Sequence, residues 1–170
     1  VNWRASHYLK VEVDKILGRE NFRNEIVWGF SSPSVAKRHI PRKHDVLLWW
    51  GVGDYTFNPL RVSHKPGFSV GGKTSWAGDV LDAITYMDRG KLIEDWWIDI
   101  PSLCRNEGEK LGFPTQKPEG LLCRVVSMFS MPGDLVVDPM MGSGTMGRAA
   151  IVQGRGFLGC DLRGHQSPIK

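Results

Sequence analysis

The chain has 170 residues, of which 41% are hydrophobic and 24% are charged, and its formal net charge is +4. This length accommodates one domain with a proper core rather than two, and the composition is that of an ordinary globular protein. No apolar run approaches the ~18–20 residues that cross a bilayer, and no basic start followed by an apolar stretch marks a secretory signal. The sequence therefore argues against a membrane protein and a secreted one.

The three cysteines are scattered and never form a Cys-x-x-Cys pair; they are Cys104, Cys123 and Cys160. An odd number of distant cysteines fits neither a disulfide framework nor a zinc site. The five histidines add no recognisable ligand spacing. We therefore expect reduced thiols in a cytoplasmic protein and no metal site.

The first two thirds of the chain combine one helix with short strands. Apolar residues at helical spacing predict a helix over 5–17, which a glycine ends. Apolar, β-branched and aromatic runs predict strands over 25–30, 45–50 and 96–101. The glycine-dense stretch 51–80 predicts a long loop or a small irregular subdomain.

The last third of the chain has a more regular pattern. A helix is predicted to begin at Pro118, and a buried strand follows over 135–137. After a glycine-rich loop, a second helix is predicted over 145–153 and a further strand over 156–161. A strand, loop, helix and strand in this order predict a βαβ unit of a parallel sheet, and hence an α/β fold class.

The strongest motif is the loop at this strand-to-helix turn, which reads Asp138-Pro139-Met140-Met141-Gly142-Ser143-Gly144-Thr145. Glycines let the backbone approach a ligand closely, and the start of the helix offers free N–H groups. Asp161 ends the next strand 19 residues after Gly142, close to the ~20-residue spacing at which an acid reaches ribose hydroxyls. The loop therefore predicts a nucleoside-binding site.

A dinucleotide site has to be considered, because residues 142–147 satisfy the Gly-x-Gly-x-x-Gly pattern. However, Asp138 puts a carboxylate at the end of the strand, where it repels a pyrophosphate and favours a sulfonium cation or an amino group. The loop also lies near the end of the chain, with no room after it for the rest of a dinucleotide fold. A P-loop is excluded because no Gly-Lys-Ser/Thr follows.

A second motif, Thr115-Gln116-Lys117-Pro118, lies directly ahead of a predicted helix. Its polar side chains could meet a ligand that bears a carboxylate, such as the methionine end of S-adenosylmethionine (SAM). A capping turn with a solvated lysine explains the same residues, and the motif alone does not decide between the two.

Basic residues concentrate between positions 35 and 75, where seven lysines and arginines stand against two acids. Residues 76–110 carry eight acids against four bases. The basic block predicts a phosphate-contacting surface, with an ordinary solvated loop as the alternative. Its members are Lys37, Arg38, Arg42, Lys43, Arg61, Lys65 and Lys73.

The order of these motifs resembles that of the β-group N6-adenine/N4-cytosine DNA amino-methyltransferases, in which the catalytic region comes first, the target-recognition segment second and the SAM motif last. Thr-Gln-Lys-Pro at 115–118, followed by Asp-Pro-x-x-Gly-Ser-Gly-Thr at 138–145, carries the resemblance. Segments within 3–28 and 42–58 are similar to the regions that follow the catalytic motif in that family. The match runs, with gaps, over 3–161.

The resemblance implies an incomplete Rossmann-like SAM-dependent methyltransferase sheet with an inserted irregular target-recognition segment. Residues 1–30 and 96–170 would belong to the methyltransferase core, the second of them binding SAM, and residues 31–95 would form the DNA-contacting insertion. The reaction implied is methyl transfer from SAM to an exocyclic amino nitrogen of adenine or cytosine in double-stranded DNA, on a nucleotide flipped out of the helix. A cognate restriction endonuclease is a further partner that such an enzyme can have.

The resemblance also assigns roles to residues. The loop residues would line the pocket for the methionine part of SAM, Asp161 would bind the ribose hydroxyls, and the Thr-Gln-Lys segment would close over the amino-acid end. The basic residues between positions 37 and 73 would lie against DNA, with Tyr55 or Trp76 as stacking surfaces for a displaced base. The whole cofactor set implied in this way is Thr115, Gln116, Lys117, Asp138, Pro139, Gly142, Ser143, Gly144, Thr145 and Asp161.

The catalytic tetrapeptide of that family, (Asp/Asn/Ser)-Pro-Pro-aromatic, occurs nowhere in the chain, so no catalytic residue is assigned. We therefore expect a C-terminal fragment of such an enzyme, which binds SAM weakly and duplex DNA non-specifically and transfers no methyl group alone. Two alternatives stay open: a degenerate remnant that only binds DNA, and a small NAD-binding oxidoreductase.

Overall fold

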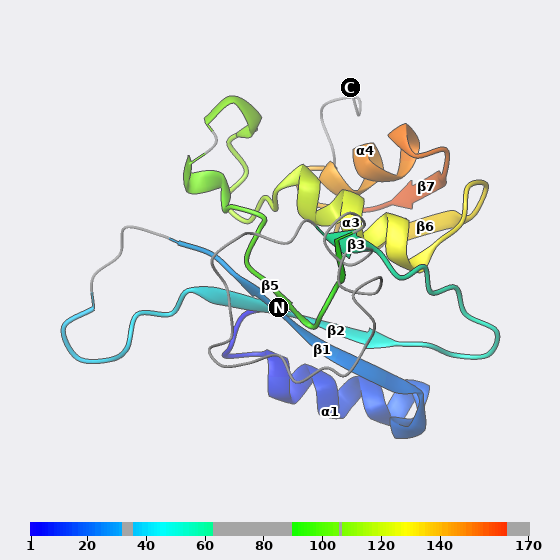
Figure 1. Ribbon diagram of the computed structural model, residues 1–170, viewed down its shortest axis with the longest axis horizontal. Coiled ribbons are helices and arrows are strands. Elements are labelled where there is room, and N and C mark those ends of the chain that lie inside the picture. The colour runs from blue at the N-terminus through cyan, green and yellow to red at the C-terminus, as the bar shows by residue number, and fades with distance from the viewer. Residues whose placement is uncertain (32–35, 63–89, 106, 163–170) are drawn as a thin grey trace, which may run out of the picture. The chain divides into compact units, whose positions relative to one another are not determined.

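The computed structural model describes residues 1–31, 36–62, 90–105 and 107–162 (Figure 1). The chain divides into two compact units. Unit 1 consists of Val1–Asn58 and Asp95–Lys170, and unit 2 consists of Pro59–Glu94. Within the described ranges, no helix is both long and apolar enough to span a bilayer.

The first part of unit 1 is a three-stranded sheet with the strand order β2-β1-β5. β1 and β2 are antiparallel, whereas β5 runs parallel to β1. Apolar side chains from all three strands are buried, among them Ile26, Val46 and Trp97. The elements of this part are α1 (Ser6–Leu17), the short helix η1 (Arg19–Asn21), β1 (Phe22–Gly29), β2 (His44–Trp50) and β5 (Trp96–Trp97).

These elements confirm the predicted helix and the first two predicted strands, but the third differs. A strand was expected over 96–101, and only two of those residues pair with β1. The short helices η2 (Leu103–Arg105) and η3 (Glu107–Glu109) follow it. The strand is short because the chain bends at residues 99 and 100, directly ahead of the proline at 101.

Asp14 holds helix α1 against the sheet. Its carboxylate accepts a hydrogen bond from the indole N–H of Trp50 at 3.0 Å and one from the ammonium of Lys10 at 2.5 Å. Gly18, at φ 87°, then ends the helix in a conformation that favours glycine. One helix side chain therefore connects α1 to the end of β2.

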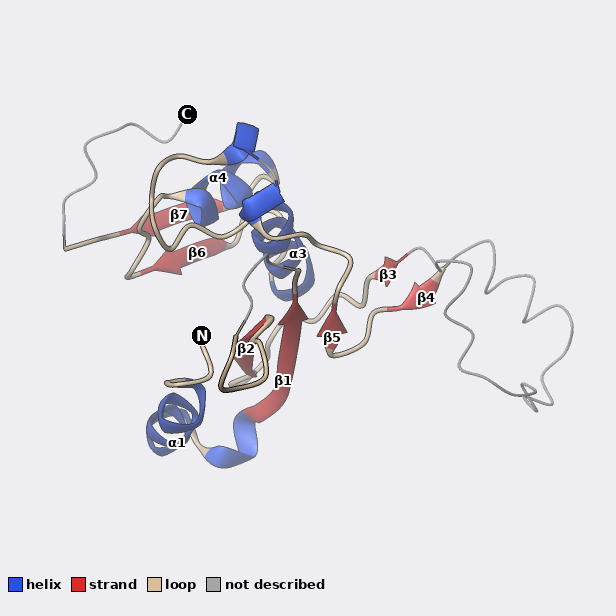
Figure 2. Cartoon of the chain, turned by 90° about the vertical axis from the view of Figure 1, so that its left-hand side faces the viewer, coloured by secondary structure: helices blue, strands red, loops and turns tan. Residues whose placement is uncertain are grey.

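The second part of unit 1 is the predicted βαβ unit, which the structure confirms. β6 and β7 pair in parallel, with Asp138 opposite Gly159, and α4 connects them (Figure 2). α3 packs against α4. The elements are α3 (Glu119–Phe129), β6 (Leu135–Asp138), α4 (Thr145–Val152) and β7 (Gly156–Gly159). The α/β fold class is therefore confirmed, with short, partial sheets.

Helix α3 connects the two parts of unit 1. The rings of Trp49 on β2 and Phe129 on α3 lie 4.6 Å apart. The side-chain amide of Asn58 donates to the carbonyl oxygens of Ser127 and Ser130 at 3.0 and 3.1 Å. These bonds satisfy carbonyl groups that the end of a helix leaves without intrahelical partners.

Unit 2 is described only at its two ends, where β3 (Arg61–Val62) and β4 (Lys91–Leu92) form an antiparallel pair. The guanidinium of Arg61 donates to the carbonyl oxygen of Gly90 at 2.8 Å. Most of the predicted irregular stretch lies outside the described residues. Although β2 falls within the predicted recognition segment 31–95, it belongs to the sheet of unit 1. The predicted roles of the three segments stay predictions.

Candidate functional site

The glycine-rich loop leaves β6 at Asp138 and is held by backbone hydrogen bonds. The N–H of Cys160 donates to the carbonyl oxygen of Asp138 at 3.1 Å, and the N–H of Met141 donates to the carbonyl oxygen of Cys160 at 3.0 Å. The carboxylate of Asp138 accepts the N–H of Met140 at 3.0 Å. The segment after β7 therefore continues the pairing of the sheet into the loop and fixes its path.

Two glycines give this loop its shape. Gly142 and Gly144 have φ angles of 51° and 76°, in the left-handed region that favours glycine. A Cβ atom on Gly142 would lie 2.9 Å from the ring of Phe113, too close for an unmoved neighbour. Gly144 is the N-cap residue of α4, so the loop leads directly to the N–H groups at the start of that helix.

Asp161 lies beside the loop and accepts the N–H of Gly142 at 3.1 Å with its Oδ2 atom. These two residues, 19 positions apart in the sequence, are thus in contact. Asp161 does not belong to the lining of the pocket beside the loop, and its expected role in binding ribose stays a prediction.

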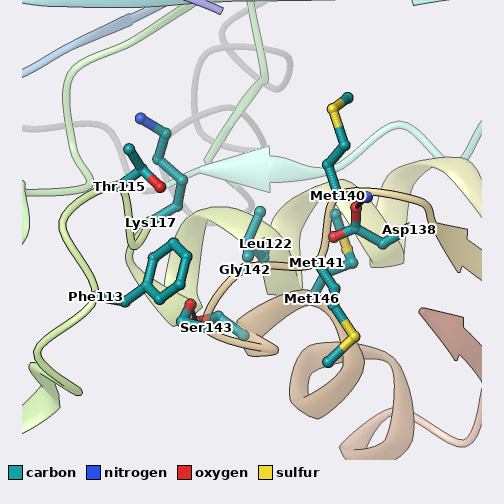
Figure 3. Close-up of a pocket in the computed structure, with 11 residues that line it drawn as sticks. Phe113, Thr115, Lys117, Leu122, Asp138, Met140, Met141, Gly142, Ser143 and Met146 are labelled. Carbon is teal, nitrogen blue, oxygen red and sulfur yellow. Dashed lines mark hydrogen bonds between the residues drawn. The ribbon is translucent and has the colours of Figure 1, made fainter. Parts of the chain in front are cut away.

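A pocket of about 130 Å³ lies between the loop and the segment ahead of α3 (Figure 3). Six residues of the predicted cofactor set line it. The residue Asp138 is half-buried, and the hydroxyls of Ser143 and Thr145 lie 2.8 Å apart. The six are Thr115, Lys117, Asp138, Gly142, Ser143 and Thr145.

The other four predicted residues do not line the pocket. Gln116 instead holds the segment in place, because its side chain accepts the N–H of Leu111 and donates to the carbonyl oxygen of Glu109, both at 2.7 Å. Pro139 and Gly144 shape the loop and Asp161 bonds to it. The helix expected to begin at Pro118 has that residue as its N-cap.

The pocket also has apolar walls, which sequence reasoning only partly identified. Met140 and Met141 lie within the motif itself, whereas Phe113, Leu122 and Met146 were not singled out. Phe113 lies two residues before Thr115 and covers Gly142 (Figure 3). Proximity in sequence could have identified Phe113 and Met146, which lie within two residues of predicted site residues, whereas Leu122 lies on α3 and had no such signal. Polar groups at the ends of an apolar cavity are typical of small-molecule sites.

The predicted DNA-contacting residues are only partly described. Lys37 and Arg38 are exposed in a bend, and Arg42 lies over the ring of Trp3, with its guanidinium carbon 3.9 Å from the ring centroid. Lys43 directly precedes β2. Arg61 belongs to unit 2 and is not placed relative to the others. Lys65, Lys73 and the expected stacking residue Trp76 lie outside the described residues.

Tyr55, the other expected stacking residue, lies in unit 1. Its ring packs edge-on against Trp49 at a centroid distance of 5.8 Å, and the guanidinium of Arg23 lies 4.9 Å from its centroid. Tyr55 as a whole is 40% exposed, and its expected stacking role stays a prediction.

Comparison with known proteins decides the family. The model of the DNA methylase family, which comprises N6 and N4 methyltransferases, matches residues 1–169. The chain belongs to this family. The resemblance drawn from the sequence is thereby confirmed.

Among the family's members, DNA adenine methyltransferase YhdJ of Escherichia coli (strain K12) is 33% identical over 145 residues. The match covers 82% of this chain and 48% of YhdJ. The chain thus spans about half the length of this relative.

Two solved structures are similar to the chain. The M1.HpyAVI–SAM complex has a TM-score of 0.60 at 23% identity, covering 95% of this chain and 65% of that one. The modification methylase TTHA0409 of Thermus thermophilus, in complex with S-adenosyl-L-methionine, has a TM-score of 0.52 at 25% identity, covering 92% and 53%. The similarity to the M1.HpyAVI complex shows the fold: the chain has a partial form of the sheet found in these methyltransferases.

Proposed function

We propose that the pocket between Thr115 and Met146 binds SAM and that the chain is the cofactor-binding part of an enzyme that transfers a methyl group to an exocyclic amino group in DNA. The observation that carries this proposal is the convergence of two motifs, 115–117 and 138–145, on one pocket. Membership of the DNA methylase family supports the reaction. The solved SAM complex of TTHA0409, at 25% identity, supports the cofactor.

The residues present fit SAM by their chemistry. Bound SAM would supply an electrophilic methyl group on a sulfonium cation, and the carboxylate of Asp138, a residue of the pocket lining, favours positive charge nearby. Apolar side chains such as Phe113 and Met141 suit the adenosine and thioether parts. Lys117 and Thr115 offer donors for the carboxylate of the amino-acid end. Asp161, beside the loop, would accept hydrogen bonds from the ribose hydroxyls.

The methyl acceptor would be N6 of adenine or N4 of cytosine, and the similarity to an adenine methyltransferase favours adenine. The exposed basic residues Lys37 and Arg38 would contact DNA phosphates. Because the sequence contains no Asp-Pro-Pro-aromatic tetrapeptide, we infer that the chain lacks the family's usual acceptor for the amino group. We expect the purified chain to bind SAM and DNA without transferring the methyl group, and incorporation of labelled methyl groups into unmethylated DNA would contradict this.

Calorimetric titration with S-adenosylhomocysteine, the unreactive product of SAM, tests the cofactor. The wild-type chain should bind it and should not bind NAD. Asp138→Asn removes a negative charge that would attract the α-ammonium group, which S-adenosylhomocysteine keeps, and should weaken binding about tenfold, the size of one charge-assisted interaction. Asp134→Asn is the matched control, because Asp134 also accepts a backbone N–H in a turn, 2.8 Å from Met131, but lies outside the pocket.

Two results would overturn this assignment. One is tight binding of NAD without binding of S-adenosylhomocysteine, which would restore the oxidoreductase alternative. The other is an equal loss of affinity in Asp138→Asn and Asp134→Asn, which would reflect a general loosening of the fold.

A further inference from the structure

A carboxylate outside both cofactor motifs binds a lysine that lines the pocket. The ammonium of Lys117 donates to Oδ2 of Asp45 at 2.7 Å, although the two residues are 72 positions apart. The Asp45 side chain is 18% exposed and that of Lys117 is 40% exposed. Asp45 belongs to β2, a strand that neither motif includes. The pair therefore connects the first sheet of unit 1 to the segment that lines the pocket.

Asp45 is itself held in a well-defined place. It lies directly opposite Trp28 in the antiparallel pairing of β1 with β2. Trp28 is only 3% exposed, and its indole N–H donates to the carbonyl oxygen of Ile100 at 2.9 Å. The ammonium of Lys117 lies 5.8 Å from the centre of the Trp28 ring, within the range of a cation–π contact. A buried ring and a strand carboxylate thus fix the end of a flexible side chain.

This arrangement matters because a lysine side chain is flexible. Ordering its four rotatable bonds costs conformational entropy, which a ligand would otherwise have to offset. In the ion pair the side chain is already ordered, and the amino end points away from the Gly142–Ser143 turn (Figure 3). The ammonium has three N–H donors, and the bond to Asp45 uses one of them. Donors remain for an anionic group at this end of the pocket.

We propose that Asp45 is a positioning residue for the cofactor, which fixes Lys117 so that its ammonium receives the carboxylate of the amino-acid end. This inference rests on the proposed SAM site and extends it to a residue outside the cofactor motifs. Asp45 acts through Lys117 and does not touch the cofactor itself. Its contribution should therefore depend on the carboxylate of the ligand and be absent for a ligand that lacks one.

A comparison of two ligands separates this role from a structural one. S-adenosylhomocysteine carries the amino-acid end, whereas 5′-methylthioadenosine keeps the adenosine and the sulfur but lacks it. Asp45→Asn should weaken S-adenosylhomocysteine about five- to tenfold, a modest effect because the pair is partly exposed to solvent. It should leave 5′-methylthioadenosine unchanged. Lys117→Met should have the same selectivity, and the double variant should bind no worse than Lys117→Met alone.

Two further variants serve as controls for misfolding. Asp45→Glu keeps the charge and should retain most of the affinity for S-adenosylhomocysteine. Glu25→Gln removes an exposed carboxylate from the neighbouring strand β1 and should change the affinity for neither ligand. Each variant should keep the circular dichroism spectrum of the wild type.

The outcomes distinguish this inference from the proposed function. If the wild type binds S-adenosylhomocysteine and Asp45→Asn binds it equally well, the positioning role of Asp45 is wrong and the cofactor site stands. Equal weakening of both ligands by Asp45→Asn also overturns the role, because a structural effect would not depend on the carboxylate. If the wild type does not bind S-adenosylhomocysteine, the proposed function fails and this inference fails with it.

Discussion

The loop between β6 and α4 and the basic segment before β2 both carry residues predicted to bind a ligand, but their surroundings differ. The loop is held by backbone hydrogen bonds to the segment after β7, and two of its glycines have positive φ angles. Lys37 and Arg38 are exposed in a bend. Binding at the loop should depend on shape, whereas binding at the basic segment should depend on charge. Single substitutions should therefore be severe in the loop and mild in the segment.

The largest effect is expected for Gly142→Val. The new side chain would meet Phe113, and φ of 51° strains a β-branched residue. We expect S-adenosylhomocysteine affinity to fall about 100-fold or more in calorimetry. The control is Gly53→Ala, at φ 64° with no heavy atom within 4 Å of the new Cβ, which introduces backbone strain outside the pocket. Near-wild-type affinity in Gly142→Val would contradict the assigned shape of the loop.

A smaller effect is expected for the double variant Lys37→Ala/Arg38→Ala. Removing two phosphate contacts should weaken duplex DNA about tenfold at low salt and reduce the slope of log affinity against log salt by about 2. S-adenosylhomocysteine affinity should stay unchanged. Lys15→Ala, an exposed lysine on α1 with a side chain 64% exposed, is the matched control in the same fluorescence anisotropy titration. An unchanged salt slope would favour a solvated loop without a binding role.

The rates at which the three thiols are alkylated should differ by a few-fold and give a probe of the region around the loop. Burial, followed by the charges of Glu119 and Glu109, raises the pKa of the Cys123 thiol. Its thiolate fraction at pH 8 is therefore lower than that of an ordinary thiol, and it should react with iodoacetamide more slowly than the exposed Cys104 and Cys160.

Cofactor binding should change one of these rates. Cys160 donates to the carbonyl oxygen of Pro139 at the glycine-rich loop, so S-adenosylhomocysteine should slow its alkylation and leave Cys104 unaffected. Mass spectrometry of the modified peptides measures the three rates. Equal protection of Cys104 and Cys160 would show that the ligand acts on the whole fold.

The smallest effect is expected from the titration of Asp14. Hydrogen bonds from Lys10, and then from Trp50, lower the pKa of its carboxyl group below the ordinary value, although burial opposes this. A lowered pKa in the folded state means that the stabilisation is present above the unfolded pKa and is lost as the pH falls through the folded one. Unfolding in urea should therefore show a weaker loss of stability below about pH 4 in Asp14→Asn than in the wild type. Parallel pH profiles for the two proteins would contradict this.

Local sequence patterns predicted the secondary structure better than they predicted contacts between residues far apart in the sequence. Residues 135–161 form the expected strand, loop, helix and strand, because their periodicity, glycines and helix start are all local signals. The pair of Asp45 and Lys117 was not predicted, since no pattern joins residues 72 positions apart. Gln116 was expected in the pocket and instead bonds to Leu111 and Glu109, because it closes a turn in which its N–H donates to the carbonyl oxygen of Phe113.

The sequence also did not predict how the strands pair. The sequence predicted strands near β1, β2 and β5 but gave no order for them, because the order depends on contacts across many residues. β3 and β4 are two residues each, too short to stand out in any periodicity. The basic block was identified by charge alone, and charge does not specify which residues meet a partner.

A nuclear magnetic resonance titration tests the central contrast most directly. The amide signals of the wild-type chain would be followed as S-adenosylhomocysteine is added and, in a second sample, as a short DNA duplex is added. We predict that the cofactor product shifts the signals of 115–117 and 138–146, and that DNA shifts those of 37–43 in a salt-dependent manner. Shifts by S-adenosylhomocysteine confined to residues outside the pocket, or none at saturating concentration, would contradict the account.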